Sequence, residues 1–315
     1  MKTVIIYIYD IDSKKFPFDT PYYADGYLDL LLGLRASGVK AYFTTGAENY
    51  LGEGRFSVAY TTDHKCAPEE FERHENVVAD LVFNRGTFEL IDPDFFTPNP
   101  VSIIDILRSK AEIYTHFGQF QPKSIACNSQ AEVEAAFAEI QGDMIVAKEP
   151  VGGSGDFVYI GSRKEVLAKL PNRFPILVQE FMDTSIGIPG LVDGIHDLRL
   201  ELAGGVVIGG TIRQPNTPGE YRANVSRGGK EIFLYPNQIP AEAMAIALEI
   251  DSHFKGLPRD YSADFGNTPH GFRLIEMNRI PAIVPASQGP AAKNISDGLI
   301  AYLIQLVTTG KTEQS

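Results

Sequence analysis

Cysteines and long apolar runs are both scarce in this 315-residue sequence. Its two cysteines, Cys66 and Cys127, are too few for the disulfide framework of a small secreted domain, and no Cys-x-x-Cys pair indicates zinc. A reducing, cytoplasmic environment is therefore expected. No apolar stretch reaches the roughly 18 residues that a membrane helix requires. The apolar residues 3–9 are followed at once by charged residues, which predicts a first β-strand and not a secretory signal.

Basic charge is also in short supply. Lys and Arg number 28 against 40 Asp and Glu, which gives a formal net charge of −12 at pH 7. Nucleic acids and anionic membranes are bound mainly through basic surfaces, so neither is expected as a partner. A small anion in one locally basic cleft stays open as a ligand, and homo-oligomerisation stays open as well.

Several familiar catalytic motifs are missing. The six histidines show neither His-x-x-x-His nor His-Glu-x-x-His spacing, so the sequence does not indicate a zinc hydrolase. Ser154 lies in GGSGD, which lacks the last glycine of a Gly-x-Ser-x-Gly nucleophile elbow. The P-loop and dinucleotide-binding patterns are absent too. Any functional residues are therefore expected in segments that match none of these motifs.

The order of short β-branched runs and amphipathic stretches predicts three units. Residues 1–100 alternate strand and helix patterns, which is typical of an α/β domain with parallel strands, and the prolines at 93–100 mark a linker. Residues 101–175 predict a small α+β unit, and residues 176–315 a sheet of long antiparallel strands covered by helices. The expected strands are 3–9, 39–44, 80–84, 144–148, 157–160, 176–181, 198–202, 206–213, 262–265 and 273–278, and the expected helices are 23–37, 102–117, 130–140, 164–170, 241–254 and 295–307.

A glycine-rich turn, GGSG at residues 152–155, lies between two predicted strands, and Lys148 ends the first of them. Glycine lets backbone N–H groups approach phosphate oxygens without a Cβ in the way, and Lys148 adds a positive charge. A plain hairpin turn is the alternative interpretation. The turn therefore predicts phosphate binding only in combination with a second site.

A candidate metal site lies near the C-terminus. Glu276 and Asn278 are two residues apart on a predicted strand, so their side chains share one face. A turn within residues 267–271 that paired Asp264 with Leu274 would bring Asp264 to the same face. Two carboxylates and an amide oxygen suit a hard cation such as Mg²⁺. A solvated strand face is the alternative.

Six segments in a fixed order resemble the ATP-grasp superfamily, and most closely its glutathione synthetases and RimK-type glutamate ligases. They are SK at 109–110, the Lys148 hairpin, QEF at 179–181, DLR at 197–199, RAN with GG at 222–229, and D…EMN at 264–278. Each segment alone is a weak signal, but six in order are a strong one. The resemblance implies an ATP-grasp fold with an N-terminal Rossmann-like pre-ATP-grasp α/β domain at 1–100, a small lid subdomain at 101–175 and a C-terminal antiparallel-sheet subdomain at 176–315.

The resemblance also implies ATP and Mg²⁺ as cofactors and a role for individual residues. Lys110 and Lys148 would hold the nucleotide phosphates beneath a glycine-rich lid. The QEF segment would meet the adenine, and Asp197 would lie near the ribose. The nucleotide set is Lys110, Lys148, Gly152, Gly153, Ser154, Gly155, Gln179, Glu180, Phe181 and Asp197. The catalytic set is Arg213, Arg222 and Asn224, and the ligands of one or two Mg²⁺ ions, with Mn²⁺ as an alternative, are Asp264, Glu276 and Asn278.

Two departures from the family pattern concern the adenine-side loop and the acceptor end of the site. Residues 184–194 are inserted between the QEF and DLR segments, and RIPA at 279–282 stands where the family commonly continues with Ser-Ser-Pro-Gly. A further candidate is Arg85, which follows a predicted strand of the N-terminal unit, where α/β sheets usually place ligand groups. We expect Arg85 to contribute to the choice of substrate.

The sequence as a whole predicts an ATP-dependent carboxylate–amine ligase that acts on amino acids or peptides. In such an enzyme a substrate carboxylate attacks the γ-phosphate of ATP, and an amine captures the resulting acyl phosphate. No general base is assigned, because binding geometry and charge neutralisation can supply most of the rate. Two alternatives stay open, namely a nucleotide-binding module without turnover and a phosphotransferase that acts on a hydroxyl.

Overall fold

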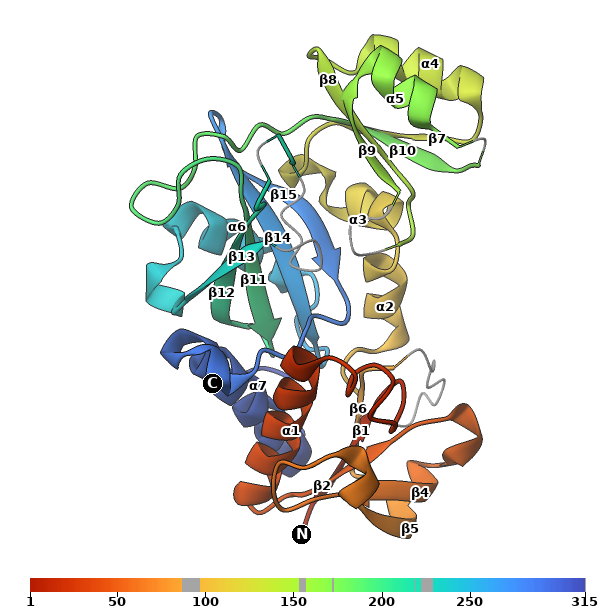
Figure 1. The fold of residues 1–315 in the computed structure, drawn as a ribbon, viewed down its shortest axis with the longest axis vertical. Coiled ribbons are helices and arrows are strands. Elements are labelled where there is room, and N and C mark those ends of the chain that lie inside the picture. Colours follow the sequence, from red (N-terminus) through yellow and green to blue (C-terminus); the bar gives the residue numbers. More distant parts are fainter. Residues whose placement is uncertain (87–96, 153–156, 172, 218, 222–228, 315) are drawn as a thin grey trace.

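Three β-sheets follow one another along the chain in the computed structural model, which describes residues 1–86, 97–152, 157–171, 173–217, 219–221 and 229–314. Figure 1 shows the N-terminal sheet at the bottom, a five-stranded sheet in the middle and a four-stranded sheet at the top. Among the described residues, no helix combines the length and the apolar character needed to cross a membrane.

The N-terminal sheet is parallel at its centre and antiparallel at one side. β1 (Thr3–Tyr7) lies between β2 (Lys40–Thr44) and β6 (Leu81–Asn84) and is parallel to both. All five residues of β1 are buried, as its unbroken apolar run predicts for a central parallel strand. The sequence analysis did not predict the three remaining strands, which are β3 (Tyr50–Gly52), β4 (Arg55–Thr61) and β5 (Glu72–Val78). Of these, β4 pairs antiparallel with β2 and so joins them to the parallel part of the sheet.

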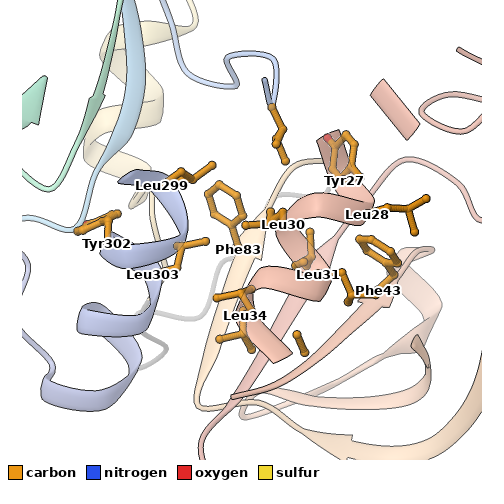
Figure 2. Close-up of a cluster of buried hydrophobic side chains, with 14 of the residues drawn as sticks. Tyr27, Leu28, Leu30, Leu31, Leu34, Phe43, Phe83, Leu299, Tyr302 and Leu303 are labelled. Atoms are coloured by element: carbon orange, nitrogen blue, oxygen red, sulfur yellow. The ribbon is translucent and has the colours of Figure 1, made fainter. Parts of the chain in front are cut away.

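Two helices join the N-terminal sheet to the rest of the molecule. The leucines of α1 (Pro21–Ala36) pack on Phe43 and Phe83 of the N-terminal sheet, and α7 (Pro290–Thr309) packs on α1 from the other side (Figure 2). Leu299, Tyr302 and Leu303 of α7 belong to the same buried cluster, shown in Figure 2. The first and last helices of the chain therefore share one hydrophobic core.

The helix expected over residues 102–117 is two helices. α2 (Val101–Leu107) ends at Arg108, and α3 (Lys110–Phe117) begins after Ser109, whose extended backbone and side chain cap the new helix at the N–H of Glu112. The Lys110 N–H donates to the carbonyl of Pro150 at 2.7 Å. The break therefore attaches the start of α3 to the segment that leads into the glycine-rich turn.

The four-stranded sheet is antiparallel in the order β7-β10-β8-β9. Its strands are β7 (Ser124–Cys127), β8 (Met144–Lys148), β9 (Val158–Ser162) and β10 (Ile176–Glu180), and α4 (Gln130–Glu139) and α5 (Arg163–Lys169) pack against it. The sequence analysis predicted that residues 176–180 belong to the C-terminal sheet. That prediction is wrong, because these residues form β10, which pairs with β7 and β8. A short apolar strand looks the same in either sheet, and only its long-range pairing decides. We propose that the unit boundary follows Glu180.

The five-stranded sheet is antiparallel in the order β13-β12-β11-β14-β15. Its strands are β11 (Asp197–Ala203), β12 (Val206–Gln214), β13 (Lys230–Leu234), β14 (Asp260–Thr268) and β15 (Gly271–Asn278). Alternate residues such as Leu198, Leu200 and Phe265 pack with α6 (Ala241–Ser252), α2 and α3 in one core. Short 3₁₀ turns occur at Ala47–Asn49, Pro68–Glu70, Gly118–Phe120, Pro236–Gln238 and Ala286–Gln288.

Candidate active site

Charged and polar side chains occupy the face of the five-stranded sheet opposite the α6 core. Because side chains alternate along a strand and directly paired residues share a face, the strand register brings them together. Asp197 lies opposite Arg213, Arg199 opposite Asp264, and Asp264 opposite Glu276. This polar face comprises Asp197, Arg199, Glu201, Arg213, Glu231, Ser262, Asp264, Glu276 and Asn278.

The hairpin that carries the expected metal ligands has a different register from the one assumed. Phe265, and not Asp264, pairs with Leu274, and the register shifts so that Asp264 pairs with Glu276. The extra residue on β15 is Ile275, which makes a bulge, and its carbonyl accepts a hydrogen bond from the Gln121 side chain at 3.1 Å. The expected result still holds, because Asp264, Glu276 and Asn278 share one face.

Asp264 is held by two arginines. Arg199 donates from Nε and Nη2 to its two carboxylate oxygens at 2.7 Å each, and Arg213 Nη2 donates to Oδ2 at 2.6 Å. Arg213 also binds Asp197 through two contacts of 2.6 and 2.9 Å. Asp264 is only 1% exposed, and burial alone would raise its pKa, but the two guanidinium groups outweigh burial and hold the pKa well below its usual range.

The sequence analysis missed both of the other polar-face residues of β11, Arg199 and Glu201. Arg199 is the last residue of the DLR segment and received no role, although its spacing from Asp197 places both side chains on one face. Glu201 continues the same alternation, and burial raises its pKa to about 8. Its cross-strand neighbour Ser262 has a buried hydroxyl with no hydrogen-bond partner among the described residues. The period of two along β11 was the signal for both.

Lys148 lies at the end of β8, buried to 5% exposure. Its ammonium group donates to Oε1 of Gln179 at 2.9 Å, and Gln179 in turn donates to Ser124 at 2.7 Å. No ion pair to Lys148 is present in the described part of the chain. Burial lowers the pKa of Lys148 to about 8, against the opposing attraction of Glu276. A buried ammonium with only a neutral partner fits a site that receives an anion such as a phosphate.

The other expected nucleotide residues surround this lysine unevenly. Lys110 Nζ donates to the carbonyl of Gly152 at 2.6 Å, and Gly152 has a φ of 140° that favours glycine. Glu180 accepts a hydrogen bond from the Lys123 N–H at 3.3 Å. The Phe181 ring lies edge-on to the ring of Tyr221, with centroids 5.0 Å apart. The remaining predicted residues lie outside the described part of the chain; these are Gly153, Ser154, Gly155, Arg222 and Asn224.

A cleft of about 600 Å³ lies between the polar face and the N-terminal unit. Arg199, Arg213, Glu276 and Asn278 line it from the five-stranded sheet. Rings from the β1–α1 segment and from α1 line it from the N-terminal side, and residues 280–283 complete it. The cleft therefore opens onto Glu276 and Asn278, two of the three expected metal ligands.

Arg85 also lines this cleft but is only 2% exposed. Its guanidinium donates to Asp260 at 2.9 Å and to the carbonyl of Pro281, and it lies over the Phe83 ring. Asn99 adds two hydrogen bonds to the backbone of Asp260, at 2.6 and 2.8 Å. These contacts attach the N-terminal unit to β14 and give Arg85 a structural role. A contribution of Arg85 to substrate choice remains a prediction.

The donor set on β14 and β15 fits a hard cation. Asp264 and Glu276 carry carboxylate oxygens and Asn278 an amide oxygen, the ligand type that Mg²⁺ prefers, and both oxygens of Asp264 also accept hydrogen bonds from arginines. Groups of three or more His, Cys, Asp or Glu side chains able to hold a metal are absent from the described residues, which leaves no alternative of that kind there. The Asn278 side chain lies 3.4 Å from Oδ2 of Asp264.

Comparison with known proteins gives consistent matches. A family model described as the RimK-like ATP-grasp domain matches residues 107–288, more than half of the chain. A curated relative named probable alpha-L-glutamate ligase, from Syntrophotalea carbinolica, is 24% identical over 222 residues. That match covers 66% of this chain and 66% of the relative's own length.

Solved structures resemble the chain over almost its whole length. A RiPP-associated ATP-grasp ligase from Chryseobacterium gregarium, in complex with ADP and a leader and core peptide, has a TM-score of 0.64 at 13% identity and covers 97% of both chains. The ATP-grasp ligase PsnB, complexed with a variant of its minimal precursor, Mg and ADP, has a TM-score of 0.57 at 13% identity over 95% of this chain and 98% of that one. At these identities the likeness concerns the fold.

Proposed function

The chain belongs to the RimK-like ATP-grasp family, and on that premise we propose that it is an ATP-dependent carboxylate–amine ligase. The observation that carries the proposal is that the described residues offer both a buried positive charge for phosphate and a set of oxygen ligands for a cation. Lys148 is a buried ammonium without an anionic partner there, and the polar face offers Asp264, Glu276 and Asn278 as oxygen ligands. A triphosphate with a divalent cation satisfies both.

The proposed nucleotide site lies between the four-stranded sheet and the polar face. Lys148 and Lys110 bind the phosphates, Gln179, Glu180 and Phe181 meet the adenine, and Asp197 orients Arg213. Gly152, together with Gly153, Ser154 and Gly155, covers the phosphates, and Arg222 and Asn224 complete the catalytic set. Bound ADP in the relative from Chryseobacterium gregarium, and Mg and ADP in PsnB, support ATP and Mg²⁺ as the ligands. One or two ions, with Mn²⁺ as an alternative, are proposed for the three ligands.

Arg213, together with a cation bound on the polar face, would supply the positive charge that the reaction requires. Bound Mg²⁺ would neutralise phosphate charge as it transfers. Arg213, oriented by Asp197 and Asp264, faces the cleft where a substrate carboxylate attacks the γ-phosphate and becomes an acyl phosphate. Preorganised guanidinium groups of this kind stabilise the charge that develops in the transition state. An amine then attacks the acyl carbon, and phosphate leaves as the amide bond forms.

The proposed substrates are small carboxylates and amines of the amino acid or peptide type, and the proposed location is the cytoplasm. The peptide complex of the relative from Chryseobacterium gregarium supports this substrate class. The two free thiols, Cys66 and Cys127, support a reducing compartment.

A panel of amino acids and short peptides, scored for ADP and phosphate release with Mg·ATP, tests the ligase proposal. Release that needs both a carboxylate and an amine is the expected result. Release with transfer of phosphate to a hydroxyl would favour the phosphotransferase, and ATP binding without release would favour the nucleotide-binding module.

ATP affinity is expected to depend on the charge of Lys148. Because its pKa is about 8, the free protein loses this charge as the pH rises through 8, and ATP affinity should fall by about tenfold between pH 7 and pH 9. Lys148→Ala should bind ATP about ten- to a hundredfold more weakly at pH 7 and show a flat pH profile. Calorimetric titration with Mg·ATP measures both. An unchanged affinity in the variant would remove Lys148 from the site.

A further inference from the structure

The N-terminal wall of the cleft is built from aromatic rings. Tyr9, Phe16 and Tyr23 form a chain in which Tyr9 and Phe16 have ring centroids 5.3 Å apart, and Phe16 and Tyr23 4.9 Å apart, both edge to face. Tyr22 extends the chain, with its centroid 5.5 Å from that of Tyr23. Tyr9 is 42% exposed and Phe16 37%. Apolar rings that remain exposed beside a site favour a ligand that covers them.

A second part of the cleft lining is apolar as well. It consists of Ile280, Pro281, Ala282 and Ile283. Arg85 is the one cation on the N-terminal side of the described lining, and it already pairs with Asp260 at 2.9 Å. A second carboxylate on a substrate would therefore find no free positive charge in this part of the cleft, and burying it there is unfavourable.

The charged part of the same cleft lies at Arg213, Glu276 and Asn278. A substrate whose carboxylate reaches these residues shares the cleft with the rings and with residues 280–283. The volume of about 600 Å³ falls in the range of small-molecule sites, about 300–1,000 Å³, and leaves room for a bulky side chain. Edge-to-face contact is one of the two arrangements that aromatic pairs prefer, so an aromatic ring of a ligand can pack on this chain in the same way.

Resting on the proposed ligase function, we propose that the activated carboxylate belongs to an amino acid or peptide residue with an aromatic side chain, which the rings of Tyr9, Phe16 and Tyr23 hold. The rings act on substrate selection and take no part in phosphoryl transfer. Substrates with aliphatic or acidic side chains of similar length are expected to bind more weakly.

The test uses hydroxylamine as a general amine. Carboxylate attack on ATP releases ADP, and hydroxylamine then attacks the acyl carbon, so that phosphate leaves and a hydroxamate remains. The probes are L-phenylalanine, L-leucine, L-alanine and L-glutamate, and Gly-Gly tripeptides that end in the same four residues. Hydroxamate formation gives KM for each probe, and calorimetry gives the affinity of each probe for the protein loaded with Mg·ADP. We expect the phenylalanine probes to have about 10- to 100-fold lower KM and Kd than the alanine probes.

Phe16→Ala should remove most of this preference, and Phe16→Leu should lower the preference for phenylalanine relative to leucine. Tyr235→Ala is the matched control, because Tyr235 is an aromatic residue with the same 37% exposure but lies outside the cleft lining. Thermal unfolding verifies that each variant folds. Equal affinity for phenylalanine, leucine, alanine and glutamate probes, or no measurable binding of any probe, overturns the inference. Aromatic preference in binding without ADP release would keep the inference and count against the ligase proposal.

Discussion

Replacing Glu276 by Gln is expected to lower kcat by about 10²–10³-fold while leaving the protein folded. Glu276 lies directly opposite Asp264 on the polar face and lines the cleft, where its carboxylate would balance the charge of a bound cation. Glutamine keeps the size of the side chain and one oxygen but removes that charge. Steady-state ADP release at saturating Mg·ATP, with the carboxylate and amine found by the panel, measures the effect.

Glu249→Gln is the matched control for this change, because Glu249 is an exposed carboxylate on α6, outside the cleft lining. It should turn over as the wild type does. Thermal unfolding of both variants separates a loss of chemistry from a loss of structure. Normal turnover by Glu276→Gln would show that the polar face of β15 is not the metal site.

Asp264→Ala is expected to lower the free energy of unfolding by about 3–5 kcal/mol. The substitution leaves Arg199 with no carboxylate partner among the described residues and Arg213 with Asp197 alone. The Arg199 and Arg213 side chains are only 16% and 7% exposed, so water replaces only part of the lost attraction. Urea unfolding in the absence of nucleotide measures the effect apart from any role in metal binding.

A surface ion pair gives the comparison for Asp264. Lys293 and Asp297 pair at 2.6 Å on α7, but both side chains are more than half exposed. Asp297→Ala should therefore cost less than about 1 kcal/mol. A similarly small cost for Asp264→Ala would mean that the arginine network on the polar face contributes little to stability.

The hairpin of β14 and β15 was predictable because its evidence is local. Glu276 and Asn278 alternate with apolar residues, and a period of two assigns their faces without knowledge of the rest of the chain. The expected ATP-grasp fold is confirmed, and it rested on six short segments in order and on no single one of them. The bulge at Ile275 could not be predicted, because the alternation of polar and apolar residues along β15 is equally compatible with a regular hairpin that has no bulge.

Non-local pairing explains the larger errors. β10 has the apolar pattern of a buried strand, and nothing within residues 176–180 specifies which sheet receives it. The antiparallel strands β3, β4 and β5 carry mixed polar sequences, and they extend the N-terminal sheet because β4 pairs with β2 and the other two pair with β4. The break between α2 and α3 is different, since Ser109 followed three residues later by Glu112 is a recognised helix-start pattern that was available in the sequence.

The parts of the site that lie within one local motif could be predicted, but the parts that depend on contacts between segments far apart in the sequence could not. Lys148 and Glu276 come from motifs, whereas the ring wall of the cleft comes from residues 9–27 and faces strands that are about 200 residues away along the chain. Arg85 illustrates the limit, because its position after a strand predicted a contribution to ligand binding but gave no sign of its ion pair with Asp260. Only the folded chain brings these segments together.

Transfer of oxygen from the substrate carboxylate to phosphate tests the ligase mechanism most directly. With a carboxylate substrate labelled with ¹⁸O, attack on the γ-phosphate places one labelled oxygen in the bridge of the acyl phosphate, and amine attack releases it with phosphate. Mass spectrometry of the released phosphate should therefore find one ¹⁸O atom per molecule, in step with amide formation. Unlabelled phosphate, or phosphate retained on a hydroxyl of the product, would contradict the ligase mechanism.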